Sequence, residues 1–179
     1  MAADGKIALE VVTPRGVALR AEVEEVVAPS IAGEFGVLAG HVPLLAALKT
    51  GLVRYRLDGK LHQVAVGAGF VEVNHDRALL LTDRFLQEGE VDVAVVRTRL
   101  EEVDRSIDDW QGELRDPARL ELCEEEQWLA AQLELAGEPP VPTVLEPNRA
   151  VNYAELLPTD EPPTEGAEPH DDDAHAAGG

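Results

Sequence analysis

The hydrophobic spacing of this chain changes once, near Glu88, and that change limits the folds open to it. Before Glu88, apolar and polar side chains alternate, as in segments 7–12 and 17–24. Alternation with a period of two is typical of strands with one buried face. After Glu88, apolar residues recur at intervals of three and four, which is the spacing of an amphipathic helix. The sequence therefore predicts an α+β chain, with a β domain first and helices second.

Turn residues divide the first part, residues 1–88, into many short strands. Asp58-Gly59 lies between the apolar segments 52–57 and 61–66, and an Asp-Gly pair in that position is a strong signal of a β-hairpin. Gly67, Gly69 and the segment 74–76 mark further turns. Many short strands within about eighty residues favour an antiparallel β-sandwich or a flattened barrel.

The second part, residues 89–136, is predicted to form an antiparallel pair of helices. The apolar stripe of the first helix, which should run for about six turns, consists of Val96, Leu100, Val103, Ile107, Trp110 and Leu114. Asp116 and Pro117 are a helix-start signal, with Asp as N-cap and Pro at the first helical position. The second helix offers Leu122, Leu129, Leu133 and Ala136 and ends at Gly137. We expect the two stripes to pack together, with Trp110 and Trp128 as buried anchors.

Residues 137–179 differ in composition from the rest of the chain. They hold eight of the 12 prolines and ten acidic residues against one basic residue, Arg149. Such a segment buries too little apolar surface to offset the entropy of ordering, so we expect a disordered or extended acidic tail. Its sparse apolar residues, in 141–157, could form a docking segment, but a solvated linker is the favoured interpretation. The His-Asp run 170–175 leaves weak divalent-cation binding open in the same way.

Charge and motifs exclude several classes of function. A net charge of −20 argues against binding to nucleic acid or anionic lipid, because phosphate neutralisation needs clustered Lys and Arg. No apolar run is long enough to span a membrane, and a single cysteine, Cys123, fits a reducing cytoplasm. The histidines have no metal-ligand spacing, and neither a nucleophile elbow nor a phosphate-binding loop occurs. The sequence thus predicts no catalytic, cofactor or metal site, and an interaction role is favoured.

The most specific segment runs from Gly33 to Gly51, where glycines and Pro43 interleave with apolar residues as GEFGVLAGHVPLLAALKTG. Because glycine permits positive φ and proline ends an incoming strand, we expect a shaped loop. This segment closely resembles the signature loop of the epsilon subunit of bacterial F-type ATP synthase. The resemblance extends over roughly residues 7–136, by eye.

The resemblance implies a fold and a role. Epsilon subunits have a ten-stranded N-terminal β-sandwich and a C-terminal helix pair, and they are noncatalytic rotor subunits of the central stalk. They bind the gamma subunit and the c-ring, meet the alpha and beta subunits transiently, and couple ion-driven rotation to ATP synthesis. The complex is peripheral on the cytoplasmic face of the bacterial inner membrane, and the helix pair regulates ATP hydrolysis in some members. By position, Glu34, Phe35, Gly40 and His41 are the candidates for contact with the c-ring or gamma.

Two departures from the family concern regulation. Some members bind ATP through an aliphatic residue, Asp, two variable positions and then Arg-Ala. The matching stretch here begins at Val91-Asp92 and carries Val95 in place of the Arg. Valine cannot donate a hydrogen bond to a phosphate group, which argues against ATP binding. Arg97 or Arg99 could still donate to phosphate by a different arrangement. The last helix of inhibitory members is basic, whereas the stretch 121–126 here is acidic, so it should repel acidic segments of beta.

Three alternatives from other classes remain open, of which a divalent-cation buffer would rest on the acidic tail. A stand-alone interaction module would never accompany an ATP synthase. A small-molecule enzyme built on the sandwich would need a polar cavity lined by residues such as Tyr55, His62 and Glu72.

Overall fold

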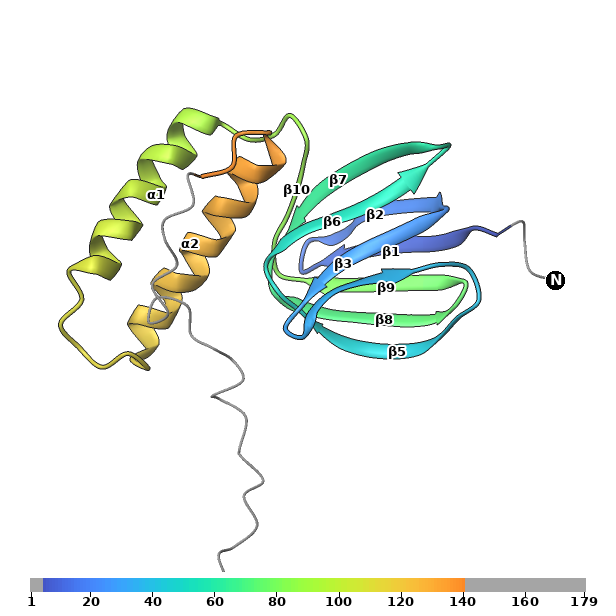
Figure 1. The fold of residues 1–179 in the computed structure, drawn as a ribbon, viewed down its shortest axis with the longest axis horizontal. Coiled ribbons are helices and arrows are strands. Elements are labelled where there is room, and N and C mark those ends of the chain that lie inside the picture. Colours follow the sequence, from blue (N-terminus) through green and yellow to red (C-terminus); the bar gives the residue numbers. More distant parts are fainter. Residues whose placement is uncertain (1–4, 141–179) are drawn as a thin grey trace, which may run out of the picture.

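The computed structural model describes residues 5–140, which form ten strands followed by two helices (Figure 1). The strands are β1 (Ile7–Thr13), β2 (Gly16–Val23), β3 (Glu25–Ser30), β4 (Gly33–Val37), β5 (His41–Leu48), β6 (Gly51–Leu57), β7 (Lys60–Val66), β8 (Gly69–His75), β9 (Arg77–Thr82) and β10 (Phe85–Gln87). The helices are α1 (Val93–Asp108) and α2 (Pro117–Leu135). The predicted α+β order is confirmed. The predicted acidic tail lies outside the described residues from 141 onward.

The strands form one curled sheet, in the order β10-β7-β6-β3-β5-β8-β9-β1-β2, with β4 paired to β3. Because β3 meets β5 through a single residue pair and β2 returns to lie beside β6, the sheet folds into two layers. One layer contains β5, β8, β9, β1 and β2, and the other contains β10, β7, β6, β3 and β4. The pairings are antiparallel except for that of β1 with β9, which is parallel. The predicted antiparallel arrangement thus fails for this one pairing, because alternation along a strand carries no information on the direction of its neighbour.

The core between the layers is mainly aliphatic. Its fully buried side chains include Ile7, Leu9, Val11, Val53, Val64, Val71 and Leu80. Along β1 these alternate with outward-facing residues, which confirms the period of two in this segment. The alternation therefore assigns each residue of a strand either to the core or to the outer surface of its layer.

The Asp58-Gly59 turn joins β6 to β7 as predicted. The two strands pair from Gly51 with Val66 to Leu57 with Lys60. Both turn residues have positive φ, 49° at Asp58 and 76° at Gly59, which is the backbone of a type I′ turn. The glycine is needed here because an L side chain is strained at that φ.

The segment 33–51 is not a loop, contrary to the expectation. It forms β4, a short turn at 38–40 and the whole of β5, including Pro43. The register of β5 against β8 shifts between His41 and Leu44, so Pro43 lies where a missing N–H breaks no regular ladder. The glycines thus act in strands and at their ends, where Gly33 and Gly40 have positive φ.

The helix pair lies to one side of the sandwich in Figure 1, and α2 is the helix that contacts β6 and β7. Both helix starts carry side-chain caps, since Asp92 accepts from the Val95 N–H and Asp116 from the Ala118 N–H. At the end of α2, the Gly137 N–H donates to the Glu134 carbonyl and the Glu138 N–H to the Leu133 carbonyl. These two bonds form a Schellman motif, which ends the helix at the predicted glycine.

Candidate functional site

The four residues that the resemblance marks as contact candidates lie at the two ends of one sandwich segment. Glu34 and Phe35 are on β4, opposite Pro29 and Ala28. Glu34 is exposed and forms an ion pair with Arg54 of β6, whereas Phe35 packs on the sandwich core. Glu34 is thus held by a partner within the sandwich.

Gly40 and His41 lie at the opposite end of the strands from Glu34. The Gly40 N–H donates to Asp76 Oδ1 at 2.9 Å. His41 pairs with His75, and its Nδ1 donates to the Val42 carbonyl at 2.7 Å. Since β4 runs from the Glu34 end to this turn, the structure does not bring the four candidates into one patch. Glu34 and His41 are close in sequence but far apart in space, because the segment between them is extended, at about 3.3 Å per residue.

The helix pair buries an apolar cluster of its own. Its members are Val96, Leu100, Val103 and Ile107 from α1, and Cys123, Leu129 and Leu133 from α2, with Leu122 partly buried against them. These are the positions that the two sequence stripes single out, together with the cysteine. Cys123 is therefore a core residue of the pair.

The two tryptophans do not anchor this pair, which corrects the expectation for both. Helix α1 ends at Asp108, so Trp110 and Leu114 lie in the connection, where the Trp110 Nε1–H donates to the Glu113 carbonyl at 3.1 Å. Trp128 packs instead on the cluster that joins α2 to the sandwich, formed by Leu52, Ala65, Ala131 and Leu135. The guanidinium of Arg84 lies 5.8 Å from the Trp128 ring centroid, within reach of a cation–π contact.

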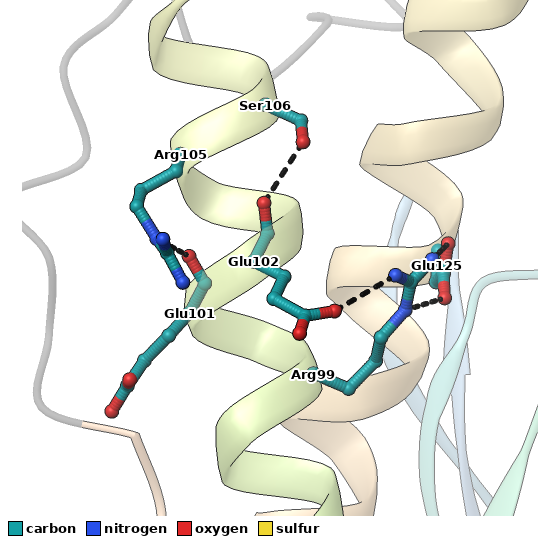
Figure 2. Close-up of polar contacts among 6 residues, drawn as sticks. All are labelled: Arg99, Glu101, Glu102, Arg105, Ser106 and Glu125. Carbon is teal, nitrogen blue, oxygen red and sulfur yellow. Dashed lines mark hydrogen bonds and ion pairs between the residues drawn. The ribbon is translucent and has the colours of Figure 1, made fainter.

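One arginine links the two helices on their solvent side (Figure 2). Arg99 of α1 donates from Nε and Nη2 to the two carboxylate oxygens of Glu125 on α2, at 2.8 and 3.1 Å. Its Nη1 also donates to Glu102 at 3.1 Å. The pKa of Arg99 is raised, chiefly by the hydrogen bonds to Glu125 and then Glu102. In contrast, Arg105 and Ser106 in the same view donate to backbone carbonyls within α1.

The stretch that aligns with the family's ATP motif is used here for helix structure. Asp92 caps α1, and the Val95 side chain is exposed to solvent. Arg97 forms an ion pair with Glu138 just after α2, and Arg99 is bound to Glu125 and Glu102. Both arginines that remained as an alternative route to phosphate are thus engaged within the chain.

The outer surface of the β5-β8-β9-β1-β2 layer carries apolar side chains that no described residue covers. Their register places one residue from each of the five strands in a single cross-strand row, here called the apolar row: Ala47, Phe70, Leu81, Val12 and Val17. Phe70 is 57% exposed and Leu81 46%. Leu45 and Leu79 lie in the next row of the same surface. A contiguous apolar surface of this kind marks a protein interaction site.

A charged cluster borders the apolar row. Glu10 of β1 accepts from Arg20 Nε and Nη2 at 3.0 and 2.7 Å through Oε1, and from Arg77 Nη2 at 2.9 Å through Oε2. The hydrogen bonds from Arg20 and then Arg77 lower the pKa of Glu10. Sequence reasoning did not single out these residues or the apolar row. The alternation gives the outward face, but only the register shows which strands lie side by side.

The structure does not bring Tyr55, His62 and Glu72 together around one polar cavity, because Glu72 lies on the other layer of the sandwich. Tyr55 points into the core and its ring stacks on His62, with centroids 5.3 Å apart, and burial raises the pKa of Tyr55. Glu72 faces outward from the other layer. Within residues 5–140, no group of three or more His, Cys, Asp or Glu side chains is arranged to hold a metal ion. No helix in that part of the chain is both long and apolar enough to cross a membrane.

Comparison with known proteins identifies the sandwich. Residues 6–88 match the family model described as ATP synthase, Delta/Epsilon chain, beta-sandwich domain. The ATP synthase epsilon chain of Carboxydothermus hydrogenoformans is 40% identical over 96 residues, covering 54% of this chain and 72% of that protein. The epsilon chain of Anaeromyxobacter dehalogenans is 33% identical over 73% of this chain and 98% of its own length.

A solved structure shares the fold as well. A chain in the Euglena gracilis mitochondrial ATP synthase assembly of OSCP, F1 and c-ring superimposes with a TM-score of 0.63 at 24% identity, covering 74% of this chain and 82% of that one. The matching sandwich, the helix pair that follows it and the identity to several bacterial relatives agree with one another. The chain belongs to the ATP synthase epsilon chain family.

Proposed function

We propose that this protein is the noncatalytic central-stalk subunit of an F-type ATP synthase, bound to the gamma subunit and to the c-ring. Its relatives are named ATP synthase epsilon chains, and the Euglena gracilis assembly that contains the similar chain holds F1 and a c-ring. In this role the sandwich turns with the rotor and links ion-driven rotation to ATP synthesis in the alpha-beta hexamer. The complex is peripheral, on the cytoplasmic side of the inner membrane.

The observation that carries the proposal is the uncovered apolar row on the β5-β8-β9-β1-β2 layer. The helix pair packs on β6 and β7 through α2 and leaves Phe70 and Leu81 of the apolar row exposed. We assign the apolar row to gamma. For the c-ring we assign the end of the sandwich that carries Glu34, where the ring's polar loops would meet the Glu34–Arg54 ion pair. Gly40 and His41 lie at the other end and are left out of that contact.

The test is association with the cognate gamma subunit, measured by gel filtration and by titration of labelled protein. We expect a stable complex, which Phe70→Asp should weaken strongly because it buries a charge in the apolar row. Leu61→Asp, at an exposed leucine of the other layer, is the matched control and should leave binding unchanged. A chain that never associates with its gamma would instead be the stand-alone module.

We further propose that the helix pair brakes ATP hydrolysis only weakly and binds no nucleotide. Residues 89–140 carry fifteen acidic side chains against five basic ones, whereas residues 5–88 carry ten against nine. Acidic segments of the beta subunit would therefore repel the helix pair. The ATPase rate of the cognate complex with full-length protein should lie within about twofold of that with protein ending at Glu88, roughly 0.4 kcal/mol of barrier. A tenfold rise on truncation would overturn this proposal.

A further inference from the structure

In the charged cluster at the edge of the apolar row, the carboxylate of Glu10 is largely buried and the guanidinium groups of Arg20 and Arg77 are exposed to solvent. The Glu10 side chain is 16% exposed, whereas those of Arg20 and Arg77 are 71% and 57% exposed. Three strands contribute to the cluster, with Glu10 on β1 between Arg20 on β2 and Arg77 on β9. Glu10 therefore holds both guanidinium groups in place, and the cluster keeps one net positive charge.

Most hydrogen-bond donors of the two arginines are left over. A guanidinium carries five N–H donors. Glu10 takes hydrogen bonds from two nitrogens of Arg20 and one of Arg77. A partner that covers the adjacent apolar row would remove water from the remaining donors. Because a charged group without a partner is costly to desolvate, such a partner has to supply acceptors at this point.

We propose that Arg20 and Arg77 form a recognition site for an acidic side chain of the gamma subunit, a step that rests on the proposed function. A carboxylate accepts two hydrogen bonds from one guanidinium in the same plane, which suits it better than a neutral acceptor. Glu10 is the positioning residue of this site, since it fixes the arginines without facing the partner itself.

The other charges on this face set the orientation of the partner. Glu72 on β8 lies three strands from Arg20, about 14 Å away at the usual strand spacing. Glu22, opposite Ala8, lies toward the rim of the same face. Glu22 lies two residues along β2 from Arg20 and in the same cross-strand row as Arg77. The face therefore presents the arginine pair, with Glu22 beside it, on one side and Glu72 on the other, with the apolar row alongside. A partner with an acidic group facing β2 and β9 fits in one orientation only.

The experiment measures the dissociation constant of the cognate gamma subunit at low and at high salt. The double variant Arg20→Gln/Arg77→Gln should bind at least about tenfold more weakly at low salt and lose most of the salt dependence. The matched control Arg56→Gln/Lys60→Gln removes two positive charges from β6 and β7, on the other layer. It should bind as the unaltered protein does, and a cooperative melting transition in each would show that both doubles are folded.

A triple variant, Glu10→Gln/Arg20→Gln/Arg77→Gln, separates recognition from a simpler effect. The double variant leaves Glu10 without its partners, and that stranded carboxylate alone would weaken docking. If recognition is the cause, the triple variant stays as weak as the double. Binding of either the double or the triple at the unaltered affinity would overturn the inference.

Failure of the inference and failure of the proposed function give different results. If the unaltered chain does not bind gamma, the function itself is wrong. If it binds, and Phe70→Asp abolishes binding while the arginine variants leave it unchanged, the function stands and the recognition site does not exist.

Discussion

Arg99 on α1 holds Glu125 on α2 through two parallel hydrogen bonds, the bidentate arrangement that fixes both distance and orientation. This ion pair joins the two helices directly, from the first half of α1 to the middle of α2. It lies on the solvent side of a pair whose inner side is apolar, so it restrains the separation of the helices.

Replacement of Arg99 should therefore loosen the helix pair without affecting the sandwich. In Arg99→Gln we expect amide hydrogen exchange to rise a few-fold in α1 and α2, since exposed ion pairs contribute modestly. Arg105→Gln is the matched control, because Arg105 donates to a carbonyl of its own helix. Equal exchange in the two variants would show that the cross-helix bond restrains nothing.

Leu133 should be a main support of the helix pair. It is 1% exposed at the centre of the apolar cluster, and truncation of such a leucine leaves a cavity. Leu133→Ala should lower the free energy of unfolding by about 2–5 kcal/mol. Leu114→Ala, at an exposed leucine of the connection, should change it by less than about 0.5 kcal/mol. Chemical denaturation followed by helical circular dichroism would measure both, and similar losses would contradict the burial pattern.

The contact of Arg84 with Trp128 should help to hold α2 on the sandwich. Arg84→Gln removes the cation above the ring and should cost about 0.5–1 kcal/mol. The emission of Trp128, recorded in a Trp110→Phe background, should shift to the red as the indole becomes wetter. Lys49→Gln changes an exposed base away from Trp128 and should leave the emission as it is. An unchanged emission spectrum in Arg84→Gln would show that the cation–π contact does not help to hold α2 on the sandwich.

Glu10 predicts a pH dependence of stability. Its folded-state pKa is lowered, first by Arg20 and then by Arg77, so the folded state binds its proton less readily than the unfolded state does. This contribution is complete above the unfolded-state pKa and is lost as the pH falls through the folded-state value. The denaturation midpoints of the unaltered protein and of Glu10→Gln should thus differ near neutral pH and converge as the pH falls below the ordinary pKa of a glutamate and through the lowered folded-state pKa of Glu10.

Glu22→Gln is the control for this titration, because it removes an acid from the same face outside the cluster. It should not reproduce the convergence. A constant difference between Glu10→Gln and the unaltered protein across the whole range would mean that the ionised carboxylate is not what stabilises the cluster.

Local patterns in the sequence predicted most of the fold because the forces behind them are local. The Asp58-Gly59 turn, the Asp116 cap and the glycine that ends α2 each act within a few residues. The periodic stripes indicated both domains for the same reason. Two predictions were wrong because a residue has another role in the structure. Pro43 lies at a register shift inside β5. Trp128 lies on α2, which packs on both α1 and the sandwich, and its side chain faces the sandwich.

The candidate site was less predictable, for a physical reason. Arg77 reaches Glu10 across a parallel pairing of two strands that are remote in sequence. No spacing in the sequence encodes which strands become neighbours. The apolar row depends on five strands meeting in register, and the separation of Glu34 from His41 depends on β4 and β5 being extended rather than looped.

The parallel pairing of β1 with β9 also bears on how the protein is made. Strand β1, which precedes the other strands of the sandwich in the chain, pairs with β9, nearly the last of them, from Ala8 with Arg77 to Val12 with Leu81. Until β9 has been synthesised, β1 has only β2 beside it, and one of its edges stays open. Because such long-range pairing is slow to form, completion of the sandwich waits for the chain to reach Thr82. The helix pair follows the sandwich in the chain, so α2 can dock on β6 and β7 only after those strands have been synthesised.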